Sequence, residues 1–172
     1  QEAIDRCEAQ GGGIIRINDG THSPGKNLII PPKTPIQFLG VNMTTTIIDF
    51  AGNFRFILAG ENIYTTGTVS ITSGTTVTGS STAWLSSGLV AGDEIFLDSR
   101  WYKIAAITGD TTIIVQEGYG GSALSGATYR AGSIVRDVEF TELTIKGSTS
   151  TSGAIDADDV RNLLIEDVTF VQ

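Results

Sequence analysis

The sequence is poor in the residues that build most small catalytic and metal sites. Its 172 residues include one cysteine, Cys7, and one histidine, His22. A single cysteine cannot form an internal disulfide, and one cysteine with one histidine cannot make a Cys/His metal site. A lone histidine with no acid near it in sequence gives no basis for a Ser/His/Asp triad. We therefore predict no metal and no cofactor, and we interpret both residues as structural.

Basic residues are also scarce. Eleven Lys and Arg stand against nineteen Asp and Glu, which gives a formal net charge of −8. The basic residues are scattered along the chain, whereas a nucleic-acid-binding face needs them clustered. An acidic protein is not drawn to anionic lipid, and no apolar run approaches the roughly 20 residues of a membrane span. The expected partners therefore include no nucleic acid and no membrane.

What the sequence has in plenty is β-branched residues and glycine, which favour strands and turns. The segment 2–10 has helical spacing, with Ala3, Ile4 and Cys7 on one face, and the glycines at 11–13 end it. Short apolar runs bounded by Gly, Pro, Asn or Asp follow and are expected to be strands: 14–17, 28–30, 35–39, 46–50 and 54–58. Strands this short are typical of a sandwich, a barrel or a β-solenoid.

A repeat distinguishes among these three folds. The segment RDVEFTELTI at 136–145 aligns without a gap on RNLLIEDVTF at 161–170, which lies 25 positions later. Self-similarity at 20–50 residues marks stacked units, and a coil of this size matches one turn of a parallel β-helix. Alternate side chains of such a strand point inward and stack on their equivalents, which explains why Glu139 separates the apolar Val138 and Phe140.

The two ends of a stack of coils expose an apolar core and unpaired strand edges. The N-terminal helix is expected to cover one end with Ala3, Ile4 and Cys7. No polar helix or sealing loop follows Phe170, so we expect further coils or another subunit to cover the other end. The chain begins with Gln1 rather than methionine, which also suggests a fragment of a longer protein.

The middle of the chain, 64–133, is rich in Thr, Ser and Gly and carries signals for antiparallel hairpins. We predict a five- or six-stranded barrel or curled sheet, inserted into one loop of the β-helix, where an insertion costs little entropy. The expected domains are 1–63 (cap helix and first coils), 64–133 (inserted β-domain) and 134–172 (continuing coils, truncated from a longer protein).

The beginning of the chain resembles a known family. The run AIDRCEAQGGGIIRINDGTH, followed by LIIPPKTPIQFLGV, resembles the opening of the pectate-lyase-like right-handed parallel β-helix family. The matching positions are Ala3-Ile4, 11–13, 14–17, Gly20-Thr21 and Leu39-Gly40. The sequence departs from the family at His22, where tyrosine is usual, and at Asn18-Asp19, where proline is common. The motif implies a capped first coil and no chemistry, and the resemblance covers 1–60 and 134–172.

The run from Gly67 to Tyr129 is similar to small β-domains that recur in bacteriophage tail and tailspike proteins. The two resemblances together imply an all-β fold: a right-handed parallel β-helix, capped by a short N-terminal helix and interrupted by an inserted small antiparallel β-barrel-like domain. They also imply a phage tailspike or tail-fibre component, in the virion tail or extracellular. Tailspikes of this fold are commonly homotrimers, so the resemblance implies a homotrimer in the parent protein.

Enzymes on this fold that cleave polysaccharides place carboxylates on the outward face of one strand stack. The local candidates lie in GAIDADDVRN, where Asp156 and Asp158 share one strand face and Asp159 turns away. The stretch resembles the first acidic motif of polygalacturonase-type hydrolases, whose second acidic pair would lie one coil later. Turn caps and solvated edges explain the same acids. The three acids are therefore weak catalytic candidates without a complete catalytic set.

Aromatic side chains in 64–133 are the candidates for ligand binding, because a ring face packs on the apolar face of a pyranose. Trp84 and Trp101 also suit the core of a small barrel, whereas Tyr119, in a glycine-rich loop, is expected to be exposed. We take Tyr119, Trp101 and Tyr102 as candidate ligand-binding residues.

The favoured function is a structural and receptor-binding segment of a bacteriophage tailspike or tail fibre, with bacterial surface polysaccharide as its partner. Two alternatives stay open. One is part of a polysaccharide lyase or glycoside hydrolase whose active site lies mostly downstream of this chain. The other is a secreted bacterial adhesin on the same scaffold. The lack of an assembled catalytic set favours the first function.

Overall fold

The computed structural model describes residues 1–51, 54–147 and 153–171. Its contacts divide the chain into two compact units. The first comprises Gln1–Ala59 and Val135–Gln172, and the second is Gly60–Ile134. The fold is all-β apart from one short helix and one 3₁₀ turn among these residues. No described helix is both long enough and apolar enough to cross a membrane.

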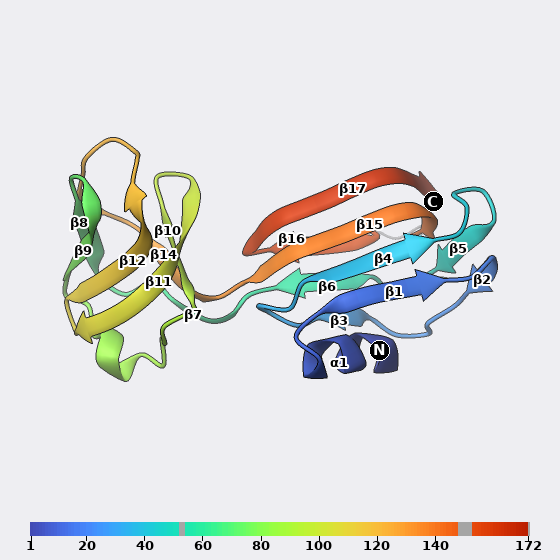
Figure 1. Cartoon of the computed structure of the whole chain (residues 1–172), viewed down its shortest axis with the longest axis horizontal. Helices are drawn as coiled ribbons and strands as arrows, with labels where there is room; N and C mark the ends of the chain where they lie inside the picture. The colour runs from blue at the N-terminus through green and yellow to red at the C-terminus, as the bar shows by residue number, and fades with distance from the viewer. Residues whose placement is uncertain (52–53, 148–152, 172) are drawn as a thin grey trace. The chain divides into compact units, whose positions relative to one another are not determined.

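The first unit begins with a helix and continues as parallel strands (Figure 1). Its elements are α1 (Glu2–Ala9), β1 (Gly13–Ile17), β2 (Gly20–His22), β3 (Leu28–Ile30), β4 (Ile36–Gly40), β5 (Thr46–Asp49), β6 (Phe56–Ala59), β15 (Val135–Lys146), β16 (Ile155–Asp158) and β17 (Val160–Val171). One sheet has the order β1-β4-β15-β5-β2, with β17 also paired to β15, and the other has the order β16-β6-β3. The helix and the five strands predicted before residue 60 are confirmed to within two residues.

These strands repeat as coils, which we call the coil stack. The first coil, β1-β2-β3, pairs in parallel and strand by strand with the second, β4-β5-β6. The long strand β15 pairs with both β4 and β5, and β17 pairs along the whole of β15. The predicted alignment of 136–145 on 161–170 is confirmed, because each residue from Arg136 to Ile145 that pairs does so with the residue 25 positions later.

The long strands turn at residues with a left-handed backbone. Asp137 and Asn162 occupy equivalent positions, with φ of 55° and 57°, and Glu142 and Asp167 form a second equivalent pair. Asn and Asp visit this conformation more readily than other residues with a side chain. The Asn162 amide also donates a hydrogen bond of 2.8 Å to the Asp137 carboxylate. The corners of neighbouring coils are therefore tied together as well as aligned.

The inward side chains of successive coils form one apolar core. Phe38 stacks on Phe140 with ring centroids 4.9 Å apart, and Phe56 meets both rings edge-on. All three rings are almost completely buried. Because aromatic pairs in such geometries add about 0.5–1.5 kcal/mol to the burial energy, this cluster is a main source of stability in the first unit.

The helix α1 packs on the first coil and buries Ile4 and Cys7, as predicted, while Ala3 is half-buried. The Gln1 side chain acts as a strand partner for β3: its Oε1 accepts from the Ile29 N–H at 3.0 Å, and its Nε2 donates to the Ile29 carbonyl at 3.1 Å. These two bonds satisfy backbone groups that an edge strand otherwise exposes. Phe170 on β17 is the equivalent of the buried Ile145 on β15, but Phe170 is 51% exposed.

The second unit is an antiparallel sheet of eight strands, where the sequence predicted five or six. Its elements are β7 (Glu61–Tyr64), β8 (Thr68–Ile71), β9 (Gly74–Ser80), the 3₁₀ turn η1 (Trp84–Ser86), β10 (Glu94–Leu97), β11 (Arg100–Gly109), β12 (Thr112–Tyr119), β13 (Leu124–Ala127) and β14 (Arg130–Ser133). The strand order is β13-β8-β9-β12-β11-β10-β14-β7. Antiparallel hairpins were expected here, and β8–β9, β10–β11 and β11–β12 are three of them. Three of the four-residue strands, β7, β13 and β14, carry no clear alternation and escaped prediction.

Trp84 lies at the centre of this unit's core, as predicted, and is completely buried. Its Nε1–H donates to the Tyr129 hydroxyl at 2.8 Å, and that hydroxyl donates to the Thr66 carbonyl at 2.7 Å. Burial raises the pKa of Tyr129 to about 12, with a further increase from Tyr64 and an opposing effect of the Trp84 hydrogen bond. The phenol therefore stays neutral at physiological pH and links the core to the backbone.

Candidate functional site

The three acidic candidates lie on and just after β16. Asp156 and Asp158 point outward, since the residues between and before them, Ala157 and Ile155, pair with the buried Leu58 and Phe56. Asp159 follows the strand with a left-handed backbone (φ 55°) and is buried. The predicted split, with two acids on one face and the third turned into the bend, is confirmed.

These acids do not converge on a metal site. Among the described residues no group of three His, Cys, Asp or Glu side chains is placed to hold a metal ion. Asp156 Oδ2 lies 3.4 Å from Arg55 Nη1, and both side chains are partly exposed. Exposed ion pairs of this kind contribute little to stability, so the pair is an ordinary surface contact. A catalytic role for the three acids stays a prediction.

The expectation that Tyr119 is exposed is wrong. Its side chain is only 6% exposed, and its hydroxyl donates to the Ser122 carbonyl at 2.6 Å. The glycine-rich loop that suggested exposure folds back over the ring. Tyr102 belongs to the core, and Trp101 is also buried, with its ring 5.0 Å from that of Phe96. Ligand binding by these three residues stays a prediction, and none of them offers an open ring face.

A cavity of about 420 Å³ lies beside these residues in the second unit. Its lining combines the half-buried Phe96 and the buried Tyr129 with an acid, a base and small groups: Phe96, Asp98, Ser99, Leu124, Ala127, Thr128, Tyr129 and Arg130. Phe96 pairs with Arg130 on one side and with Trp101 on the other, so the three form a row across β14, β10 and β11. The neighbouring row contains Ile95 and faces the core. We call the cavity the β-domain cavity.

The wall of the β-domain cavity includes the tight turn between β10 and β11. Leu97 pairs with Arg100, so only Asp98 and Ser99 form the turn, with φ of 46° and 67°. Two-residue turns of this kind favour Asn-Gly or Asp-Gly, because both residues need positive φ. A serine in the second position is a strained choice, and such strain is often retained at binding sites.

Sequence reasoning expected hairpins in 64–133 but did not select the residues of this turn. It chose the large aromatic residues, which the structure uses as packing, and it missed Phe96, Asp98, Ser99 and Arg130. One feature of the sequence could have drawn attention to this turn. Ser99 follows Asp98 at a turn position where glycine would be unstrained. The cross-strand row of Phe96 and Arg130 could not be seen, because β14 itself was not predicted.

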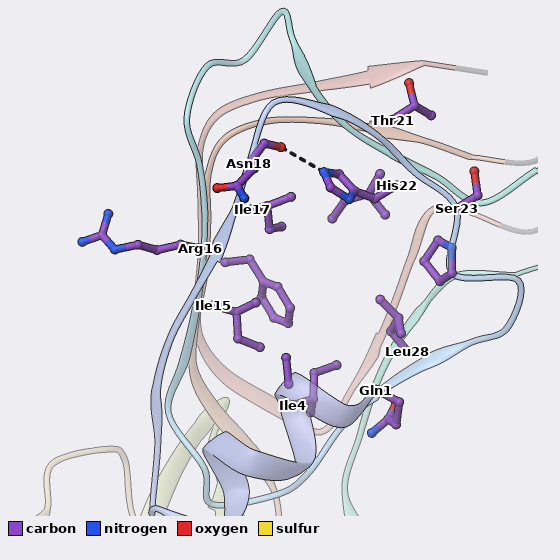
Figure 2. A pocket seen from close by; sticks show the side chains of 14 residues that line it. Gln1, Ile4, Ile15, Arg16, Ile17, Asn18, Thr21, His22, Ser23 and Leu28 are labelled. Carbon is purple, nitrogen blue, oxygen red and sulfur yellow. Dashed lines mark hydrogen bonds between the residues drawn. The ribbon is translucent and has the colours of Figure 1, made fainter.

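A second cavity, of about 650 Å³, lies at the α1 end of the coil stack (Figure 2). Figure 2 shows Ile4, Ile15, Ile17 and Leu28 around it, and its remaining apolar lining includes Phe38 and Ile48 of the next coil. His22 Nε2 donates to the Asn18 carbonyl at 2.9 Å at its rim, which agrees with a structural role for this histidine. The cavity is the part of the apolar core that α1 leaves uncovered.

The charged residue in that lining is Arg16, and Figure 2 shows its side chain directed away from the cavity. The apolar part of this larger cavity's lining therefore follows from the inward pattern of the coils, and its polar part comes from Gln1 and from residues 18–23. The β-domain cavity is smaller, yet it carries an acid, a base and an aromatic ring that the packing of its sheet does not require. It is the better candidate for a functional site.

Comparison with known proteins shows a tailspike-type fold. No family model matches the chain, and no curated protein matches it. The tailspike gp61 of Pseudomonas phage phi297 has a similar structure over 99% of the chain, with a TM-score of 0.62 and 16% identity. The tailspike gp54 of Acinetobacter baumannii bacteriophage AP22, solved in complex with A. baumannii capsular saccharide, matches over 97% with a TM-score of 0.52 and 11% identity. The chain spans 30% of the length of each tailspike.

Proposed function

We propose that the chain is a structural and receptor-binding segment of a bacteriophage tailspike, positioned at the virion tail, that recognises a bacterial surface polysaccharide. The observation that carries the proposal is the β-domain cavity, whose lining includes Phe96, Asp98 and Arg130. The shared fold with two tailspikes supports the setting, and the bound capsular saccharide of one of them supports the ligand class.

The chemistry of the β-domain cavity suits a sugar. A half-buried phenylalanine ring gives a flat apolar surface for the C–H face of a pyranose. The charged and hydroxyl groups around it can hydrogen-bond to the ring hydroxyls, which fixes orientation and provides specificity. At about 420 Å³ the cavity also lies within the range of known small-ligand sites.

The scaffold belongs to the same proposal. We propose that the coil stack is a right-handed parallel β-helix and that the second unit is inserted between two of its coils. Ala59 pairs with Asp158, and Val135 pairs with Val160. In the next coil a single residue, Asp159, makes the same connection. The second unit therefore replaces a one-residue turn, which supports an insertion. A homotrimeric parent protein also belongs to this proposal.

Binding to whole bacteria tests the function. The fluorescently labelled chain is mixed with a panel of encapsulated Pseudomonas and Acinetobacter strains, each with a matched capsule-free mutant. We expect labelling of at least one encapsulated strain and loss of it in the capsule-free partner. Phe96→Ala should reduce labelling about tenfold or more, since a stacked ring is worth roughly 1–3 kcal/mol on burial.

Leu85→Ala is the matched control, because Leu85 is an exposed apolar residue of the same unit that does not line the cavity. It should label as the unchanged chain does. Equal labelling of encapsulated and capsule-free cells, or full labelling by Phe96→Ala, contradicts the proposed function.

A further inference from the structure

The Asp98 carboxylate lies against Gly121 and Tyr119. A Cβ atom added to Gly121 would lie 2.5 Å from Asp98 Oδ2 and 2.5 Å from the Tyr119 hydroxyl, so both groups rest directly against this glycine. The Tyr119 hydroxyl lies within hydrogen-bond distance of two acceptors, to which it can donate its proton: the Ser122 carbonyl at 2.6 Å and Asp98 Oδ2 at 3.4 Å. These contacts pack one side of the carboxylate, while Asp98 itself remains exposed to solvent.

The same carboxylate forms no ion pair with a side chain in the described part of the chain, although Arg130 lines the same cavity. Arg100, two residues later, is bound instead to Glu117 at 2.9 Å and lies over the Tyr102 ring. Burial raises the pKa of Tyr119, and the negative charge of Asp98 raises that pKa further. A carboxylate that lines a cavity without an ion-pair partner is an acceptor available to an external donor.

The negative net charge of the second unit favours a neutral sugar that donates hydrogen bonds over an acidic sugar. Residues 60–134 carry six acids and three bases, a net charge of 3 − 6 = −3. Arg130 is the base in the lining, and it already takes part in an interaction within the chain. A uronic acid at the Phe96 ring would therefore meet the Asp98 carboxylate without a dedicated cation. A pair of sugar hydroxyls can donate to both oxygens of that carboxylate.

We infer that Asp98, positioned by Tyr119 and Gly121, selects a neutral hexopyranose with two adjacent hydroxyl groups, which donate to its carboxylate while the sugar ring packs on Phe96. The inference rests on the proposed function and assigns its specificity to the turn between β10 and β11. Tyr119 acts here as a positioning residue behind the carboxylate, and the sugar does not stack on its ring.

The test uses the purified surface polysaccharide of a strain that the unchanged chain labels, titrated by calorimetry. Asp98→Asn keeps the shape but loses the charged acceptor, and we expect its affinity to fall about tenfold or more, as for loss of a charge-assisted hydrogen bond. Tyr119→Phe and Gly121→Ala should each weaken binding, because both disturb the position of the carboxylate. Asp167→Asn, the same change at an exposed left-handed residue of the other unit, should bind normally.

The polysaccharide itself can also be changed. Periodate cleaves adjacent hydroxyl pairs, so the oxidised polymer should lose binding, whereas reduction of any uronic acids to neutral sugars should preserve it. Affinity should vary little with salt, since no ion pair forms with the ligand.

Failure of this inference and failure of the proposed function give different binding results. If Asp98→Asn binds within twofold of the unchanged chain while Phe96→Ala does not bind, the cavity recognises sugar but the role of Asp98 is wrong. If carboxyl reduction abolishes binding, the ligand is acidic and the inference is overturned. If no strain is labelled at all, both the function and the inference are overturned. Tyr119→Phe provides the positioning test if Gly121→Ala unfolds the second unit.

Discussion

Phe38 and Phe140 stack with their ring planes 8° apart, although the whole of Gly60–Ile134 lies between them in the sequence. The strands that carry them pair residue by residue, with Val138 opposite Ile36 and Phe140 opposite Phe38. The chain therefore leaves the coil stack after β6 and forms a separate sheet. It then returns as β15, which pairs in parallel with β4. The aromatic stack across that interruption is the most direct evidence that the coils form one structure.

Replacing Phe140 by alanine should cost about 3–5 kcal/mol of the free energy of unfolding, because the ring is fully buried among Phe38 and Phe56. Phe170 on β17 is half exposed, so Phe170→Ala should cost less than about 1 kcal/mol. Urea titration of the three proteins measures both values. Similar losses for the two variants would show that the core is not organised around the phenylalanine cluster.

Removing the second unit tests whether it is an insertion. A chain in which a single aspartate replaces Gly60–Ile134 copies the connection that Asp159 makes one coil later. We expect this shortened chain to fold, with a circular dichroism spectrum of β type and one cooperative thermal transition. An unfolded or aggregated product would mean that the coil stack depends on the second unit for its stability.

Gly40 is a position where the coils approach too closely for a side chain. A Cβ there would overlap the carbonyl oxygen of Glu142 in the next coil. Gly40→Ala should therefore destabilise the protein by about 2 kcal/mol or more, whereas Gly118→Ala, with its nearest atom at 3.9 Å, should be close to neutral. Thermal melts compare the two, and an unchanged melting temperature for Gly40→Ala would show that the coils can move apart.

Alkaline pH should weaken the second unit through Tyr129. Its pKa is about 12 in the folded protein against about 10 in an unfolded chain. Below pH 10 both states are protonated and the stabilisation is complete. Between about pH 10 and 12 only the unfolded state loses its proton, so stability falls as pH rises, by at most about 3 kcal/mol.

Urea titrations across that pH range measure the loss. Tyr129→Phe cannot ionise and should show a shallower decline than the unchanged protein, although it lacks the bonds to Trp84 and Thr66. Parallel declines in the two proteins would mean that Tyr129 does not cause the pH dependence.

The coil stack could be predicted closely from sequence because its signals are local and repeated. Apolar alternation places Val138 and Phe140 inward, and the recurrence after 25 residues sets their partners. The second unit was harder, because β7, β13 and β14 are short and gain their place from neighbours distant in sequence. The expected exposure of Tyr119 was wrong because glycines predict a loop but not the surface on which that loop lies.

The candidate site could not be predicted for a related reason. Asp98 and Arg130 line the same cavity because β10 pairs with β14, which no local pattern indicates. The acids Asp156 and Asp158, by contrast, are separated by a single residue in sequence and were easy to select. Proximity in sequence placed them on one face, and the contact of Asp156 with Arg55 is an ordinary surface ion pair.

The central claim is that this chain binds a bacterial surface polysaccharide at the β-domain cavity, and a calorimetric titration with purified capsular polysaccharides tests it most directly. The same samples are assayed for new reducing or unsaturated chain ends, which would reveal cleavage. The account predicts saturable binding to at least one polymer, lost in Phe96→Ala and retained in Asp156→Asn. Absence of binding to every polymer, or equally tight binding by Phe96→Ala, would contradict it.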